Sequence, residues 1–129
     1  MAFETGVPSQ LAAVDYLCRA AREVDGPLWV GGHSKGGNLA TYAALRAPEE
    51  VRARIERVFD HDGPGFKAGF LDEKDFEGVR GLVHRTVPEE SVVGMLMDTP
   101  IEPHVVVSTA RGAEQHSIFT WEIAGDDFV

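Results

Sequence analysis

The sequence contains one cysteine, Cys18, and no apolar run that approaches the ~20 residues needed to span a bilayer. A single cysteine excludes an intrachain disulfide and favours a reducing compartment. The first ten residues, MAFETGVPSQ, have no basic region followed by an apolar core, so they do not predict a signal peptide. These absences predict a cytoplasmic protein without a transmembrane segment.

Positive charge is also scarce, because 12 Lys and Arg stand against 21 Asp and Glu, which gives a formal net charge of −9. Without a basic stripe, binding to a phosphate backbone is not expected, and we predict no nucleic-acid partner. No His-x-x-x-His or Cys-x-x-Cys spacing occurs, so no metal or other cofactor is predicted. A chain of 129 residues that is 43% hydrophobic predicts a single globular domain over residues 1–129.

The order of predicted elements indicates the fold class. A helical stripe of apolar residues lies within residues 7–26, formed by Leu11, Val14, Leu17, Cys18, Ala21 and Val24. Further helices are predicted over 37–47 and around 91–98, with a loop or short helix at 67–77. The predicted strands are 27–32, 55–60, 80–87 and 103–109. This alternation predicts an α/β fold with a mostly parallel sheet of three or four strands and flanking helices.

A glycine cluster, GGHSKGG, joins the first predicted strand to the next helix. A phosphate-binding loop requires Gly-x-x-x-x-Gly-Lys-[Ser/Thr], but Lys35 is followed by Gly36, so the order is wrong. The nucleophile-elbow pattern Gly-x-Ser-x-Gly fits residues 32–36 directly, with a strand before it and a helix after it. An ordinary strand–turn–helix corner remains the alternative interpretation.

In an elbow, Ser34 occupies a strained turn that projects its hydroxyl clear of both flanking elements. Side chains two residues away on either side would collide, which predicts that both Gly32 and Gly36 are required. Gly37 is expected to allow close packing of the helix on the sheet. The backbone N–H of Lys35, at the start of the helix, is predicted to face a developing oxyanion.

The base and the acid of a catalytic triad should follow Ser34 in the order acid, then histidine. His116 is the predicted base, because it follows the last clear strand on a loop that can fold back over the strand ends. The other histidines are less suitable: His61 is a weaker candidate, His33 is expected to point away from the nucleophile, and His84 and His104 are expected to be structural.

Two positions compete for the acid. Asp62 follows the strand after the elbow, immediately before Gly-Pro-Gly, and Glu90 follows the next strand. Each also has a structural interpretation, because Asp-Gly is itself a turn signal and an acid near a helix start favours the helix dipole. Asp62 is the preferred acid and Glu90 is the alternative, and the third interpretation is that neither residue is the acid.

Four motifs in this order carry a resemblance to a known family: GGHSKGGNLATYAA, DHDGPGF, VPEESVVGML and VVVSTARGAEQHSIFTW. The sequence resembles a bacterial family of α/β-hydrolase-like proteins, the domain of unknown function number 2974, which is distantly similar to class 3 lipases. The resemblance implies an α/β-hydrolase core with Ser34 as nucleophile and His116 as base. In class 3 lipases the acid stands where this chain has Ser91, whereas pancreatic-type lipases place it where this chain has Asp62.

The resemblance also predicts that the chain is the C-terminal part of this fold and lacks its N-terminal strands, including the loop that carries a second oxyanion donor. A sheet edge left open in this way is expected to favour a homodimer. The predicted function is a serine hydrolase of esterase or lipase type that acts on a small-molecule ester or lipid through an acyl-enzyme on Ser34. The alternative is a catalytically inactive α/β-hydrolase-like scaffold or binding module, and a nucleotide-binding module has little support.

Overall fold

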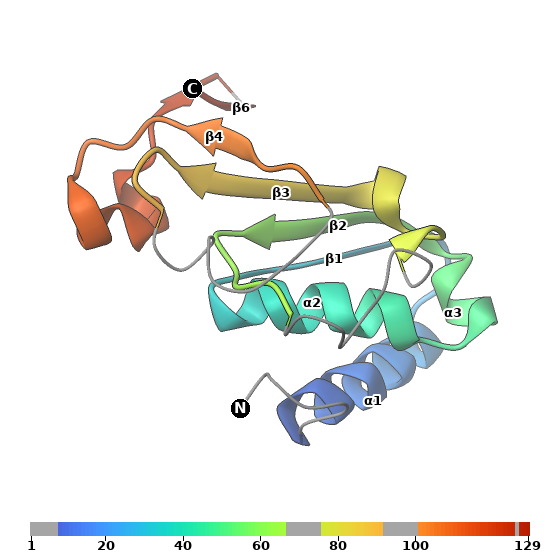
Figure 1. Cartoon of the computed structure of the whole chain (residues 1–129). Coiled ribbons are helices and arrows are strands. Elements are labelled where there is room, and N and C mark those ends of the chain that lie inside the picture. The colour runs from blue at the N-terminus through green and yellow to red at the C-terminus, as the bar shows by residue number, and fades with distance from the viewer. Residues whose placement is uncertain (1–7, 67–75, 92–100, 126) are drawn as a thin grey trace.

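The computed structural model describes residues 8–66, 76–91, 101–125 and 127–129. Its main sheet has the strand order β1-β2-β3-β4, and every pair of neighbouring strands is parallel (Figure 1). The four strands are β1 (Leu28–His33), β2 (Ile55–His61), β3 (Val83–Pro88) and β4 (His104–Val106). The predicted α/β fold with a mostly parallel sheet of three or four strands is therefore confirmed.

The helices flank this sheet, and the hydrophobic core continues between them. They are α1 (Pro8–Glu23), α2 (Lys35–Arg46) and α3 (Glu49–Arg52). Helix α2 packs on β1 and β2, and α1 packs on α2, on the far side from the sheet (Figure 1). The core between these elements includes small side chains of α2, since Ala43 and Ala44 are both buried in it.

The predicted apolar stripe of α1 is correct at its centre and wrong at its ends. Leu17 and Ala21 are buried, but Leu11 is 55% exposed and Val24 is 52% exposed, beyond the last residue of the helix. Gln10 is fully buried instead, where its side-chain amide donates to Asn38 Oδ1 at 3.2 Å. Apolar periodicity missed Gln10 because its burial depends on a polar partner on another helix.

Several boundaries differ from the prediction. The strand expected at 80–87 begins at Val83, because residues 80–82 form the 3₁₀ turn η1 (Arg80–Leu82), and β4 ends at Val106. The C-terminal region contains two more 3₁₀ turns, η2 (Gly112–His116) and η3 (Ile118–Thr120), and an antiparallel pair, β5 (Ile123–Ala124) and β6 (Asp127–Phe128). The predicted helix around 91–98, apart from Ser91, and most of the loop at 67–77 lie outside the described residues.

The register of the sheet aligns the carboxyl ends of its strands. His33 of β1 lies opposite His61 of β2, which lies opposite Thr86 of β3. The residues that follow β1, β2 and β3 therefore converge at the carboxyl end of the sheet, where α/β sheets commonly bind their ligands.

β1 and β4 are the outer strands of the described sheet, and a homodimer through an open edge stays a prediction. Among the described residues, no helix is both long enough and apolar enough to cross a membrane.

Candidate active site

Ser34 occupies a strained turn between β1 and α2. Its φ of 59° and ψ of −127° lie in a region that a residue with a side chain rarely adopts, at a cost of about 1–3 kcal/mol. The turn is held on both sides, because Ser34 N–H donates to the His61 carbonyl at 2.9 Å and the Ser34 carbonyl accepts Gly37 N–H at 2.9 Å. Lys35 N–H is the first of α2, so it has no intrahelical acceptor.

The glycines of the turn are not equivalent. A Cβ at Gly32 would lie 2.3 Å from the carbonyl carbon of Gly36, so no side chain fits there. A Cβ at Gly36 would meet no described atom outside its own helix within 4 Å, and the prediction that Gly36 avoids a collision is therefore wrong. The predicted close packing at Gly37 is confirmed, since a Cβ there would lie 2.2 Å from Asp60 Oδ1.

Asp62 and His116 form a close pair above the strand ends. His116 Nδ1 lies 2.6 Å from Asp62 Oδ2; the Asp62 side chain is fully buried, whereas that of His116 is 26% exposed. A carboxylate can only accept here, so Nδ1 carries the hydrogen and the neutral imidazole presents Nε2 as a base. Asp62 has a φ of 53°, and its N–H donates to the Thr86 carbonyl at 2.7 Å, which fixes it at the end of β2.

Ser91 contributes to the same carboxylate. Its hydroxyl donates to Asp62 Oδ1 at 2.5 Å, while His116 Nδ1 contacts Asp62 Oδ2. Sequence reasoning identified Ser91 only as the position that holds the acid in class 3 lipases. Its contact with Asp62 joins residues from the ends of two different strands, and no local sequence pattern predicts such a contact.

Glu90, the alternative acid, has a different position. Its backbone N–H donates to Gln115 Oε1 at 2.7 Å, and its carboxylate accepts the N–H of Gly112. Both contacts support η2, the turn that carries His116, while Nδ1 of His116 faces Asp62. The structure thus brings Asp62, and not Glu90, to the imidazole.

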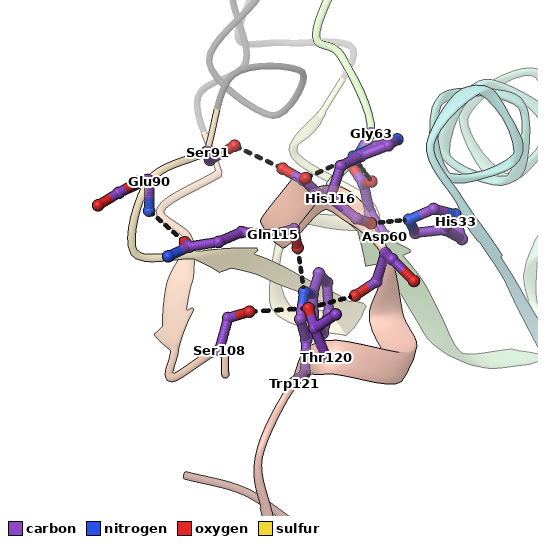
Figure 2. A network of polar contacts seen from close by, with 12 residues as sticks. His33, Asp60, Gly63, Glu90, Ser91, Ser108, Gln115, His116, Thr120 and Trp121 are labelled. Carbon is purple, nitrogen blue, oxygen red and sulfur yellow. Dashed lines mark hydrogen bonds and ion pairs between the residues drawn. The ribbon is translucent and has the colours of Figure 1, made fainter. Parts of the chain in front are cut away.

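Two aromatic side chains hold the backbone at and next to His116. Trp121 Nε1 donates to the Gln115 carbonyl at 2.6 Å, and His33 Nε2 lies 2.6 Å from the carbonyl oxygen of His116 (Figure 2). The rings of His33 and His116 have centroids 4.5 Å apart. Sequence reasoning set His33 aside, although its position next to Ser34 was a signal that it lies near the base.

The other histidines lie on the opposite side of the sheet from α2. His61 Nδ1 contacts Thr86 Oγ1 at 2.5 Å, and burial, followed by the charge of His33, lowers the pKa of His61. His61, His84 and His104 line an open groove of about 960 Å³ together with Phe59 and Phe128. Ser34, Asp62 and His116 do not line this groove, so it is a separate surface feature.

Asp60 is a second buried carboxyl group close to the turn. It is 6% exposed, faces α2, and accepts Gly63 N–H through Oδ1 at 3.0 Å. Burial raises the pKa of Asp60 to about 6, against the opposing effects of the Gly63 N–H and the Arg85 charge. This carboxyl group supports the turn that carries Asp62.

The structure brings Asp62 and His116 together, but among the described residues no hydrogen bond joins the Ser34 hydroxyl to His116. Catalytic hydrogen bonds are often long before substrate binds, so the absence of a bond between Ser34 and His116 is compatible with a hydrolase. Within the described ranges, no group of three or more His, Cys, Asp or Glu side chains is arranged to hold a metal ion. The arrangement suits acid–base chemistry at a serine.

Comparison with known proteins gives one family. The chain matches the family described as Mbeg1-like over residues 1–129. No curated protein and no solved structure matches the chain. The finer resemblance to the domain of unknown function number 2974 stays a prediction.

Proposed function

The chain belongs to the Mbeg1-like family, which is α/β-hydrolase-related, and from that premise we propose that it is a serine hydrolase acting on esters. The observation that carries the proposal is the 2.6 Å contact between His116 and the buried Asp62, at the strand ends beside the strained Ser34. A buried carboxylate fixing an imidazole near an elbow serine is the arrangement that acyl transfer requires.

The proposed reaction has two halves. The Ser34 hydroxyl attacks the ester carbonyl while His116 Nε2 accepts its proton, and Asp62 stabilises the resulting imidazolium. The carbonyl oxygen becomes an oxyanion that faces the N–H of Lys35. The imidazolium then donates its proton to the leaving alkoxide, which departs as an alcohol and leaves an acyl-enzyme. Water, activated by the same imidazole, releases the acid and restores the Ser34 hydroxyl.

The proposed substrate is a small-molecule ester or a lipid, and its support is the resemblance of the motifs to lipases. The formal charge of −9 agrees with the proposal that no nucleic acid is bound. A cytoplasmic location remains part of the proposal, with the single Cys18 in its favour.

Hydrolysis of p-nitrophenyl acetate and butyrate tests the proposal. We expect a burst of p-nitrophenol and an acyl adduct on Ser34 in the intact mass spectrum. Ser34→Ala should abolish both, and His116→Gln should slow acylation by a factor on the order of 10⁴. Circular dichroism and thermal unfolding confirm that each variant is folded.

The competing function is a binding scaffold without catalysis, which the missing hydrogen bond between Ser34 and His116 in the described residues favours. A folded chain that hydrolyses neither ester, and forms no adduct on Ser34, would establish this alternative. Hydrolysis that persists unchanged in Ser34→Ala would also contradict the proposal, because the reaction would then use another group.

A further inference from the structure

His33 links the strand of the nucleophile to the backbone of the base. It is the last residue of β1, and the next residue is Ser34. Its Nε2 lies 2.6 Å from the carbonyl oxygen of His116, across 83 residues of sequence (Figure 2). A carbonyl oxygen only accepts, so Nε2 of His33 is the donor and carries the hydrogen.

We infer that His33 is a positioning residue that sets the distance between the Ser34 hydroxyl and the imidazole of His116. The inference rests on the proposed function, because the distance matters only if these two groups react together. His33 does not exchange a proton with the substrate. It acts by fixing the place from which His116 does so.

Three contacts define the position of His116, and they differ in what they fix. Asp62 Oδ2 holds the imidazole at Nδ1, at 2.6 Å. Trp121 Nε1 holds the preceding carbonyl, that of Gln115, also at 2.6 Å. Neither residue is close to Ser34 in sequence, whereas His33 is joined to it by one peptide bond. The contact of His33 therefore transmits the position of the elbow directly to the base.

Ring packing restrains the same pair. The imidazoles of His33 and His116 lie 4.5 Å apart with an interplanar angle of 34°, and the ring of Trp121 meets His33 edge-on at 6.4 Å. A misplacement of about 1 Å in a catalytic group can cost a factor on the order of 10² in rate. Loss of the His33 contact should therefore lower the rate of acylation, since the base is no longer held against the elbow.

The test compares three substitutions. Glutamine places an amide donor near the position of Nε2, asparagine places the same donor too close to the backbone to reach, and leucine has none. We expect His33→Asn and His33→Leu to lower kcat for p-nitrophenyl acetate by at least about tenfold, with a central expectation on the order of 10²-fold. KM should be nearly unchanged. His33→Gln should restore kcat to within about threefold of wild type.

A second measurement separates the inference from the proposed function. Proton NMR should show the hydrogen-bonded Nδ1–H of His116 in wild type and in His33→Gln, and its faster exchange with water in His33→Asn. A wild-type chain without Ser34-dependent hydrolysis overturns the proposed function. An active wild type overturns the inference alone if His33→Asn keeps full kcat, or if His33→Gln loses as much as His33→Asn.

Discussion

Asp62 Oδ2 accepts a hydrogen bond from Nδ1 of His116 at 2.6 Å, although 54 residues of sequence separate the two. The carboxylate is fully buried and the imidazole is partly exposed, so solvent reaches His116 but not Asp62. Removing the partner of a buried carboxylate lowers the stability of the folded protein, so the pair contributes to stability as well as being chemically suited to proton transfer.

The two candidate acids are distinguished by amide substitutions. Asp62→Asn should lower kcat by about 10⁴-fold, because the amide no longer stabilises the imidazolium or fixes its tautomer. Glu90→Gln should stay within about threefold of wild type, since the amide oxygen still accepts Gly112 N–H. Steady-state hydrolysis of p-nitrophenyl acetate measures both. Equal losses in the two variants would make Glu90 a catalytic group and contradict the assignment of the acid.

Ser91 should contribute through Asp62. Ser91→Ala removes the hydroxyl that donates to Asp62 Oδ1, and hydrogen bonds to charged groups contribute about 1.5–3 kcal/mol. We therefore expect kcat to fall by roughly 10- to 100-fold, with little change in KM. Ser91→Thr keeps the hydroxyl and serves as the matched control. An alanine variant as active as wild type would show that Asp62 does not depend on this donor.

The unequal glycines of the elbow predict unequal costs of substitution. Gly32→Ala forces a methyl group into the backbone of Gly36, and should lower the free energy of unfolding by about 2–4 kcal/mol. Gly36→Ala meets open space inside a helix and should be neutral or stabilising by up to about 1 kcal/mol. Urea unfolding measures both. The packing of the elbow is described wrongly if Gly32→Ala is as stable as Gly36→Ala.

The buried Asp60 predicts how stability changes with pH. Burial raises its pKa from 3.8 to about 6, so the folded protein binds the proton more tightly than the unfolded chain. This contribution to stability is fully present below pH 3.8 and is lost as the pH rises through about 6. The shift corresponds to about 3 kcal/mol, counted from low pH to neutral pH.

Asp60→Asn removes this titration. The free energy of unfolding of the wild type should fall by about 2 kcal/mol relative to Asp60→Asn between about pH 4 and pH 7. Asp15→Asn is the control, because Asp15 pairs with Arg19 at 3.2 Å on an exposed helix face. A difference between wild type and Asp60→Asn that is constant with pH would contradict the raised pKa.

Local sequence signals were sufficient for the fold class and for a tight turn at Ser34 between a strand and a helix. Alternating apolar runs and helix-forming segments predicted the parallel strands, and the order of Ser34, Lys35 and Gly36 argued against a phosphate loop. The placement of His116 after the last strand of the main sheet also agrees with its position beside Asp62. These features depend on residues that are neighbours in sequence or on the known order of strand ends.

Long-range polar contacts were outside the reach of sequence patterns. Gln10 donates to Asn38 across 28 residues, and Ser91 donates to Asp62 across 29. His33 contacts the carbonyl oxygen of His116 across 83 residues. Each contact depends on where two elements converge in space, which neither composition nor periodicity encodes. For the same reason the open space at Gly36 was visible only in three dimensions.

The most direct test of the account is labelling with a fluorophosphonate probe, read by intact mass and by mapping of the modified peptide. We predict one adduct per chain on Ser34, formed quickly in wild type, slowly in Asp62→Asn and not at all in Ser34→Ala. A folded wild-type chain that remains unlabelled, or that is labelled equally in Ser34→Ala, would contradict the central claim that Ser34, His116 and Asp62 form a working catalytic set.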